Sequence, residues 1–140
     1  MSFNVKELNK YWTDIYFHLH YPHKEKITHQ VIRILQLVEK KPNIGINEVA
    51  CYLDVSHNTA SENVKRIIER NYLMKERDPS DERKVILKLT DIGREVLQRN
   101  TSLDESKLTD IWESMSSTEK SLVESAFKIL RERAKNVSVD

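Results

Sequence analysis

The stretch Arg77-Asp78-Pro79-Ser80-Asp81-Glu82-Arg83-Lys84 is the most informative part of this 140-residue chain. It lies between two short apolar runs, Tyr72-Leu73-Met74 and Val85-Ile86-Leu87-Lys88-Leu89. Pro79 sets φ to the value that a turn requires, and the Asp and Ser residues beside it favour hydrogen bonds from side chain to local backbone. Two apolar runs joined by such a turn predict a β-hairpin with a highly charged tip.

Two short helical patterns precede this hairpin, over residues 48–53 and 58–70. Asn47 and Ser56 are suitable N-caps for them, and Asn71 can adopt the left-handed conformation that often ends a helix. The link over residues 43–46 is expected to be extended and to pair with the edge of the hairpin. Helix, turn, helix and charged hairpin, in that order, are the layout of a winged helix-turn-helix. DNA binding is therefore the leading hypothesis.

Further amphipathic helices flank this lobe, because apolar residues recur there at spacings of three and four. The first pattern consists of Leu8, Tyr11, Trp12, Ile15, Tyr16 and Leu19. Thr90 is expected to cap a later helix that continues, straight or kinked, through Trp112. Ser116 and Glu119 have the spacing of a capping box that begins a last helix. Apolar stripes outside the compact lobe are most simply buried in a twofold dimer.

The predicted fold is therefore mainly α with a small β-hairpin wing, a winged helix-turn-helix joined to a helical dimerisation lobe. Residues 1–140 are expected to form a single domain. Its dimerisation helices are placed in residues 1–26 and 92–140, and its DNA-binding lobe in residues 27–91. No apolar run approaches the roughly 18 residues of a membrane span, and the N-terminus is no signal peptide, so a cytoplasmic location without membrane contact is expected.

Charge does not single out a nucleic-acid partner. The net charge is only +1, and residues 47–91 carry eight Lys or Arg against nine Asp or Glu. DNA affinity must then depend on where a few cations point. This balance motivates one alternative, a winged-helix protein-interaction module that binds a regulator in place of DNA. An enzyme is not expected, because no phosphate-binding glycine loop, metal-ligand spacing or nucleophile motif is present, and no cofactor is predicted.

The run Ile46-Asn47-Glu48-Val49-Ala50-Cys51-Tyr52-Leu53-Asp54-Val55-Ser56, followed by Thr59 and Ser61, resembles the second and third helices of the MarR (multiple antibiotic resistance regulator-like) family. The charged hairpin and Leu89-Thr90-Asp91-Ile92-Gly93 resemble that family's most diagnostic signature. The resemblance implies a homodimeric winged helix-turn-helix regulator of transcription. Most such regulators are repressors, and many release DNA when a small phenolic or lipophilic ligand, a metal or an oxidant engages the protein. The partners expected here are a palindromic operator and a small lipophilic or aromatic effector.

The same resemblance implies which residues contact DNA. The expected set is His57, Asn58, Thr59, Ser61, Lys65, Arg66, Arg83 and Lys84. Asp81 would support the wing arginine, Arg83, in the minor groove. Glu62 departs from the family pattern and is expected to pair with Arg66 one turn later. The Asn71-Tyr72 pair stands where the family usually has glycine.

Three further groups of residues allow a functional and an ordinary interpretation. His18, His20, His23 and His29 could bind zinc, but their spacing is more typical of a polar loop, and no metal site is predicted. Cys51 could sense oxidants, yet a small semi-buried packing residue is the commoner role. An aromatic set could line an effector pocket between the lobes, or could be plain core or dimer interface. This set comprises Tyr11, Trp12, Tyr16, Phe17 and Trp112.

Overall fold

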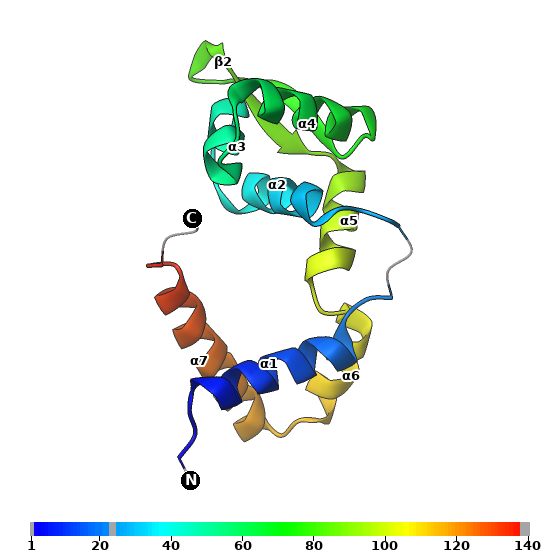
Figure 1. Cartoon of the computed structure of the whole chain (residues 1–140). Coiled ribbons are helices and arrows are strands. Elements are labelled where there is room, and N and C mark those ends of the chain that lie inside the picture. Colours follow the sequence, from blue (N-terminus) through cyan, green and yellow to red (C-terminus); the bar gives the residue numbers. More distant parts are fainter. Residues whose placement is uncertain (1, 23–24, 138–140) are drawn as a thin grey trace. The chain divides into compact units, whose positions relative to one another are not determined.

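A computed structural model describes residues 2–22 and 25–137. Within these residues the chain has seven helices and one antiparallel hairpin (Figure 1), which confirms the predicted mainly helical fold with a small hairpin. The elements are α1 (Val5–Leu19), α2 (His29–Lys40), α3 (Ile46–Leu53), α4 (His57–Glu69), β1 (Leu73–Asp78), β2 (Asp81–Leu89), α5 (Asp91–Thr101), α6 (Glu105–Ser114) and α7 (Ser117–Ala134). No helix in the described ranges is long and apolar enough to cross a membrane.

Contacts divide the chain into two compact units. One consists of Met1–Leu19 and Leu103–Asp140, and the other of His20–Ser102. The second unit contains the helix-turn-helix and the hairpin. It also contains α5, which the sequence placed among the dimerisation helices, and the part that α5 takes in dimerisation stays a prediction.

The unit of residues 20–102 is built around one apolar core. Ile34 and Leu35 of α2, Val49 of α3, Val64 of α4 and Leu97 of α5 are all completely buried there. Each helix contributes one apolar face, as amphipathic helices of small globular domains do. Since α3 and α4 both pack their apolar sides into this core, the polar side of α4 is left to solvent.

Local capping sets the ends of the helices in this unit. The Ser56 hydroxyl accepts the backbone N–H of Thr59 at 3.1 Å, and the Thr90 hydroxyl accepts that of Gly93 at 2.9 Å. Both caps were predicted from the sequence. Asn71 has a φ of 65°, which confirms the left-handed conformation expected after α4.

The predicted cap of α3 is wrong. Asn47 lies inside the helix, which begins at Ile46 after Gly45 as the N-cap, with no side-chain capping bond. The side chain of Asn47 bonds across to α4 instead, where its Oδ1 lies 2.9 Å from Nδ1 of His57. The asparagine thus joins the two helices of the helix-turn-helix.

Gly93 lies where α5 approaches the chain segment that leads into β1. A Cβ atom placed on Gly93 would lie 2.0 Å from the carbonyl oxygen of Tyr72. The same carbonyl accepts the backbone N–H of Thr90 at 3.2 Å. Glycine is needed here because the two backbones are too close for any side chain.

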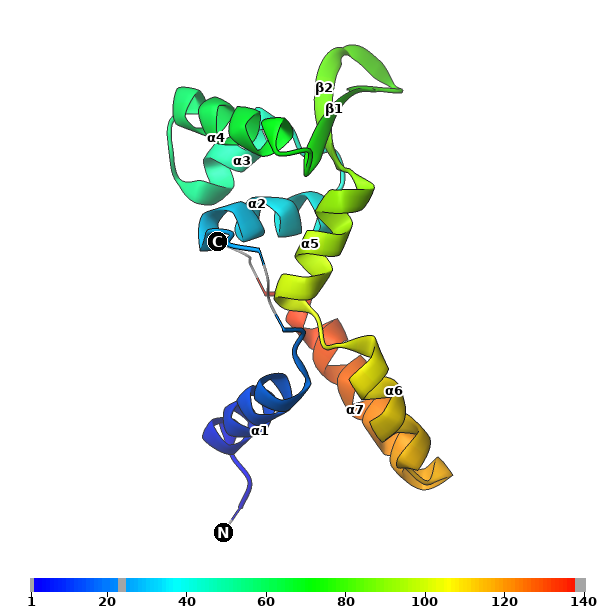
Figure 2. The same cartoon turned by 90° about the vertical axis from the view of Figure 1, so that its right-hand side faces the viewer.

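The hairpin is longer than expected. Its strands extend into the charged stretch, so that only Pro79 and Ser80 remain as the turn. At its base the Ile44 carbonyl accepts the backbone N–H of Leu87 at 2.7 Å, which confirms the expected pairing of the link before α3 with the hairpin. Figure 2 shows the hairpin projecting from the helices of its unit as a wing.

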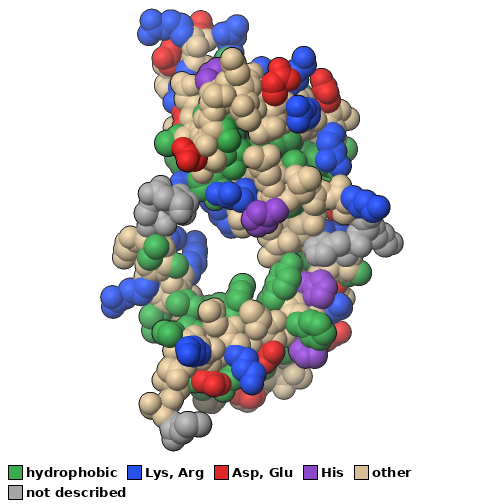
Figure 3. Space-filling model, viewed as in Figure 1, with side chains coloured by type: hydrophobic (Ala, Val, Ile, Leu, Met, Phe, Trp, Pro, Cys, Tyr) green, Lys and Arg blue, Asp and Glu red, His purple; other side chains and the backbone are tan. Residues whose placement is uncertain are grey.

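In the other unit, α1, α6 and α7 contain no buried residue. Trp12 is 49% exposed and Phe127 47% exposed, and Figure 3 shows hydrophobic side chains on the surface of this unit. Ser116 and Glu119 form the predicted capping box at the start of α7. These helices therefore carry apolar surface that the described residues of their own unit do not cover.

The long helix expected from Thr90 through Trp112 is interrupted. It ends at Thr101, and α6 begins anew at Glu105 with Asp104 as its N-cap. The Asp104 carboxylate accepts the backbone N–H of Ser106 at 3.0 Å. The kink that the sequence left open is thus a complete break between two helices.

Candidate nucleic-acid interface

The outer face of α4 is polar because the helix buries only one of its sides. Ala60, Val64 and Ile67 are buried at spacings of three and four, which turns the intervening residues towards solvent. All the α4 residues that the sequence assigned to DNA are exposed, namely His57, Asn58, Thr59, Ser61, Lys65 and Arg66. A helix with short polar side chains near its N-terminus and cations further along matches what a major groove and its flanking phosphates require.

The residues at the start of α4 differ in how far they are already engaged within the protein. His57 is bonded to Asn47, and the Thr59 hydroxyl accepts a hydrogen bond from the N-cap serine at 3.0 Å. Asn58 and Ser61 make no side-chain hydrogen bond within the described part of the chain. These two side chains are therefore the ones available for base edges.

Glu62 lies on the same exposed face as the cations of α4. The ion pair that we expected it to form with Arg66 is absent from the described residues, so that interpretation is wrong. Both side chains face solvent. An unpaired carboxylate on this surface would oppose nearby phosphates, or accept a hydrogen bond from a cytosine amine.

The wing arginine, Arg83, is held at its backbone N–H and its Nε by Asp81, while the rest of its guanidinium group is exposed to solvent. Oδ1 of Asp81 accepts the backbone N–H of Arg83 at 3.1 Å and lies 3.4 Å from its Nε. The Arg83 side chain is 94% exposed. The structure thus joins the two wing residues that the sequence paired, and it presents a guanidinium to solvent at the tip of a narrow hairpin.

The strand register explains why this arginine projects. Pairing passes from Arg77 opposite Val85 directly to Asp78 opposite Asp81. Residues 82–84 of β2 therefore face no residue of β1 and form a bulge. Bulges commonly redirect side chains near functional sites, and this one carries the two cations predicted to contact DNA.

Asp78 lies at the start of the turn, where the sequence predicted hydrogen bonds from side chain to local backbone but assigned Asp78 no functional role. Its side chain is buried, and Oδ1 accepts both the backbone N–H and the hydroxyl of Ser80, at 2.9 and 2.7 Å. The backbone bond, then the hydroxyl bond, and then the charge of Lys84 lower the pKa of Asp78 despite its burial. The Asp-Pro-Ser sequence predicted this turn, but it gave no sign that the Asp78 side chain would be buried.

Lys84 links the wing to the helix-turn-helix. Its Nζ lies 3.7 Å from Oε1 of Glu48 on α3, and both side chains are partly exposed. Lys84 and Arg83 are thus each paired with a carboxylate inside the unit. Figure 3 shows Lys and Arg side chains gathered at the tip of the hairpin, although residues 47–91 are slightly acidic as a whole.

The residues considered as metal ligands do not form a metal site in the described part of the chain. No group of three or more His, Cys, Asp or Glu there could hold a metal ion, and His23 of the histidine cluster lies outside the described residues. Cys51 is exposed, which corrects the expectation of a semi-buried packing residue.

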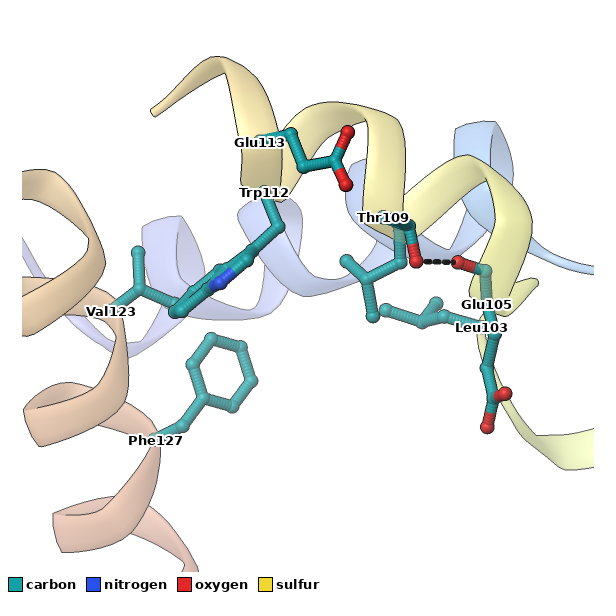
Figure 4. A pocket seen from close by; sticks show the side chains of 8 residues that line it. Leu103, Glu105, Thr109, Trp112, Glu113, Val123 and Phe127 are labelled. Carbon is teal, nitrogen blue, oxygen red and sulfur yellow. Dashed lines mark hydrogen bonds between the residues drawn. The ribbon is translucent and has the colours of Figure 1, made fainter. Parts of the chain in front are cut away.

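Two apolar hollows lie on the unit made of α1, α6 and α7. One, of about 540 Å³, is lined by residues of α6 and α7, and Figure 4 shows the rings of Trp112 and Phe127 lying beside one another in its wall. The other, of about 620 Å³, is lined by Tyr11 and Trp12 of α1 and by residues of α7. Of the aromatic residues that the sequence grouped into one pocket, Tyr11 and Trp12 thus line one hollow and Trp112 lines the other. Tyr16 and Phe17 line neither.

Comparisons with known proteins agree with this geometry. The sequence profile of the family described as "Transcriptional regulator SarA/Rot" matches residues 20–100. None of the curated proteins matches the chain. Among solved structures, a MarR-like transcriptional regulator from Thermotoga maritima has a TM-score of 0.67 at 20% identity, covering 97% of this chain and 100% of its own.

Two further solved structures are similar over nearly their whole length. FabT of Streptococcus pneumoniae, in complex with DNA, has a TM-score of 0.58 at 19% identity, covering 96% of this chain and 100% of its own. MepR of S. aureus, bound to ethidium bromide, has a TM-score of 0.61 at 15% identity, covering 94% and 97%. At such identities these similarities establish a common MarR-like winged-helix fold.

Proposed function

Because the chain belongs to the SarA/Rot family of transcriptional regulators, we propose that it is a homodimeric repressor that binds a specific operator and is released by a small ligand. Membership of this family makes it a DNA-binding winged helix-turn-helix protein and not an enzyme, as the sequence predicted. The dimer, the operator and the ligand are the parts that we propose.

The observation that carries the proposal is the arrangement of the wing. A fully extended hairpin ends in a bulge, where Arg83 is tethered by Asp81 and its guanidinium projects into solvent. An arginine in a narrow minor groove gains from the strong negative potential there. With α4 in the adjacent major groove, Asn58 and Ser61 would reach base edges while Lys65 and Arg66 contact phosphates.

Dimerisation is supported by the apolar surface of the α1, α6 and α7 unit. Large exposed apolar patches on a soluble domain mark interaction sites, and a twofold axis lets one patch serve both subunits. Two reading lobes related in this way match a palindromic operator with half-sites about one helical turn apart. The complex of FabT with DNA shows that a protein of this fold binds DNA.

Release by a ligand is supported by the two apolar hollows and by the ethidium in MepR. Hollows of this size are typical of sites for drug-sized molecules. A ligand shifts an equilibrium only as far as it binds one state better than the other. We expect an aromatic or lipophilic effector to favour a dimer whose reading lobes no longer match the operator spacing.

The test is fluorescence anisotropy with the purified protein and tiled DNA from upstream of its own gene, over a series of salt concentrations. Arg83→Ala should weaken binding to the preferred tile roughly fivefold to a hundredfold, because a good arginine contact contributes about 1–3 kcal/mol. Arg131→Ala removes the same charge from an exposed position on α7 and serves as the control. Equal, weak binding to every tile would favour the protein-interaction module, which the acidic balance of residues 47–91 motivates.

A further inference from the structure

We propose that Asp78 is a positioning residue for DNA binding: it locks the wing turn so that Arg83 projects in the direction that the minor groove requires. The proposal rests on the proposed role of Arg83. It adds a residue that touches no DNA itself and acts only through the shape of the wing tip.

The burial of Asp78 is the first observation. It is the only charged residue that is buried among the described residues, with 8% of its surface exposed, although the turn around it is solvated. A buried carboxylate must be compensated by hydrogen bonds. The N–H and hydroxyl of Ser80 provide two, both to Oδ1, and they account for the lowered pKa of Asp78.

The position of Asp78 in the strand register is the second observation. Asp78 opposes Asp81 as the closing pair of the two-residue turn. By bonding to Ser80, the Asp78 carboxylate fixes the backbone that leads directly into Asp81. Asp81 in turn holds the backbone N–H and the Nε of Arg83. A continuous series of short-range bonds thus runs from the buried carboxylate to the exposed guanidinium.

Arg77 ties the opposite side of the bulge. Its Nη1 donates to the carbonyl of Glu82 at 2.7 Å, across the point where the pairing of the strands skips residues 82–84. Turn and bulge are therefore each closed by a side-chain to backbone bond. Such bonds pre-organise the wing, so that less conformational entropy is lost when DNA binds.

The effect of removing the negative charge of Asp78 distinguishes a positioning role from a purely electrostatic effect on DNA affinity. A carboxylate near DNA repels phosphates, so removing its charge should strengthen binding if charge alone matters. Glu82 offers a matched control at the same tip, because its carboxylate makes no hydrogen bond or ion pair in the described part of the chain. Glu82→Gln should leave operator affinity unchanged or raise it.

The experiment compares operator affinity by anisotropy for Asp78→Ala, Asp78→Asn, Ser80→Ala, Glu82→Gln and Arg83→Ala. Asp78→Ala should weaken binding about fivefold to tenfold, because it removes both bonds that Ser80 donates to the charged carboxylate. Charge alone would predict the opposite, a stronger binding. Asp78→Asn should restore most of the affinity, because the amide oxygen still accepts from Ser80. Ser80→Ala removes only the hydroxyl bond and should weaken binding less. Circular dichroism should show the same fold for every variant, and Asp78→Ala should lower the urea midpoint only modestly, because it removes two local bonds outside the apolar core.

The double variant Asp78→Ala with Arg83→Ala tests whether Asp78 affects operator affinity through Arg83. If Asp78 acts through Arg83, the double variant binds no more weakly than Arg83→Ala alone. Additive losses would overturn the proposal, and so would an Asp78→Ala protein that binds like the wild type while Arg83→Ala binds weakly. If Arg83→Ala instead bound the operator with full affinity, it would refute the proposed function and, with it, the positioning role of Asp78.

Discussion

Gly93→Ala is the substitution whose effect can be worked out most directly from the structure. The new Cβ would lie 2.0 Å from the carbonyl oxygen and 2.9 Å from the carbonyl carbon of Tyr72. Both are backbone atoms, so no side-chain rotation can relieve the contact. Either α5 or the segment leading into β1 must move, although Thr90 is bonded to both sides of this contact through its N–H and its hydroxyl.

The magnitude follows from two opposing terms. Replacing glycine by alanine inside a helix stabilises it by roughly 0.8–1 kcal/mol. Forcing an extra methyl group into a closely packed site costs typically 1–3 kcal/mol, and a displacement of about 1 Å in the backbone places this site at the upper end. We therefore expect Gly93→Ala to lower the free energy of unfolding by about 2 kcal/mol. For a chain of this length that corresponds to a decrease in Tm of roughly 6–10 °C.

Urea unfolding followed by circular dichroism at constant protein concentration measures this loss. Arg94→Ala is the matched control on the next residue, because it only removes an exposed ion pair with Asp91, which contributes little. A Gly93→Ala protein as stable as the wild type, or more stable, would refute the inferred approach between α5 and Tyr72.

Further predictions concern the capping box, the apolar surface and the phosphate contacts. Ser116→Ala should cost about 1 kcal/mol in urea unfolding, and no loss would argue against the cap. Bonds from the backbone and then the hydroxyl of Ser116 lower the pKa of Glu119 below its usual 4.5. The stability that Glu119 contributes is thus complete above pH 4.5 and is lost as the pH falls through the lower folded value, so the difference between wild type and Glu119→Gln should shrink in acid. Trp12→Glu should convert a dimer to a monomer in sedimentation, and an unchanged mass would place the dimer interface elsewhere. Lys65→Ala should weaken operator and scrambled DNA equally and reduce the salt slope by about 0.9, whereas a selective loss would assign Lys65 to base recognition.

Features that depend on a few neighbouring residues were predictable. The caps at Ser56, Thr90 and Ser116 and the left-handed Asn71 all follow from side chains within four positions of a helix end. The mainly helical fold with a small hairpin could be predicted because the apolar spacings and the charged turn are strong local signals.

Features that depend on tertiary contacts could not be predicted from the sequence. Asn47 has the chemistry of an N-cap, but its position one residue inside α3 and its bond to His57 depend on how two helices meet. The absent ion pair between Glu62 and Arg66 and the exposure of Cys51 are likewise decided by packing. A hydrophobic pattern reports which residues are apolar, not which of them the fold covers.

In the wing, the length of the strands and the burial of Asp78 could not be predicted from the sequence, for a third reason. Its charged residues were expected at the tip because the apolar run that indicates the second strand begins only at Val85. Backbone pairing continues beyond that point without any apolar side chains to indicate it. A buried Asp78 is equally invisible within a run of charges, where each residue looks solvated.

The uncovered helices α1, α6 and α7 also affect how the folded population responds to protein concentration. In the proposed dimer these helices, which bury no residue of their own, would gain stability on association, a bimolecular step. The thermal midpoint of this unit should therefore rise with concentration, whereas the self-contained core of residues 20–102 should melt independently of it. Dilution would then loosen the connection between two reading lobes that each remain folded, and the cellular abundance of the chain would itself set how many operators are occupied.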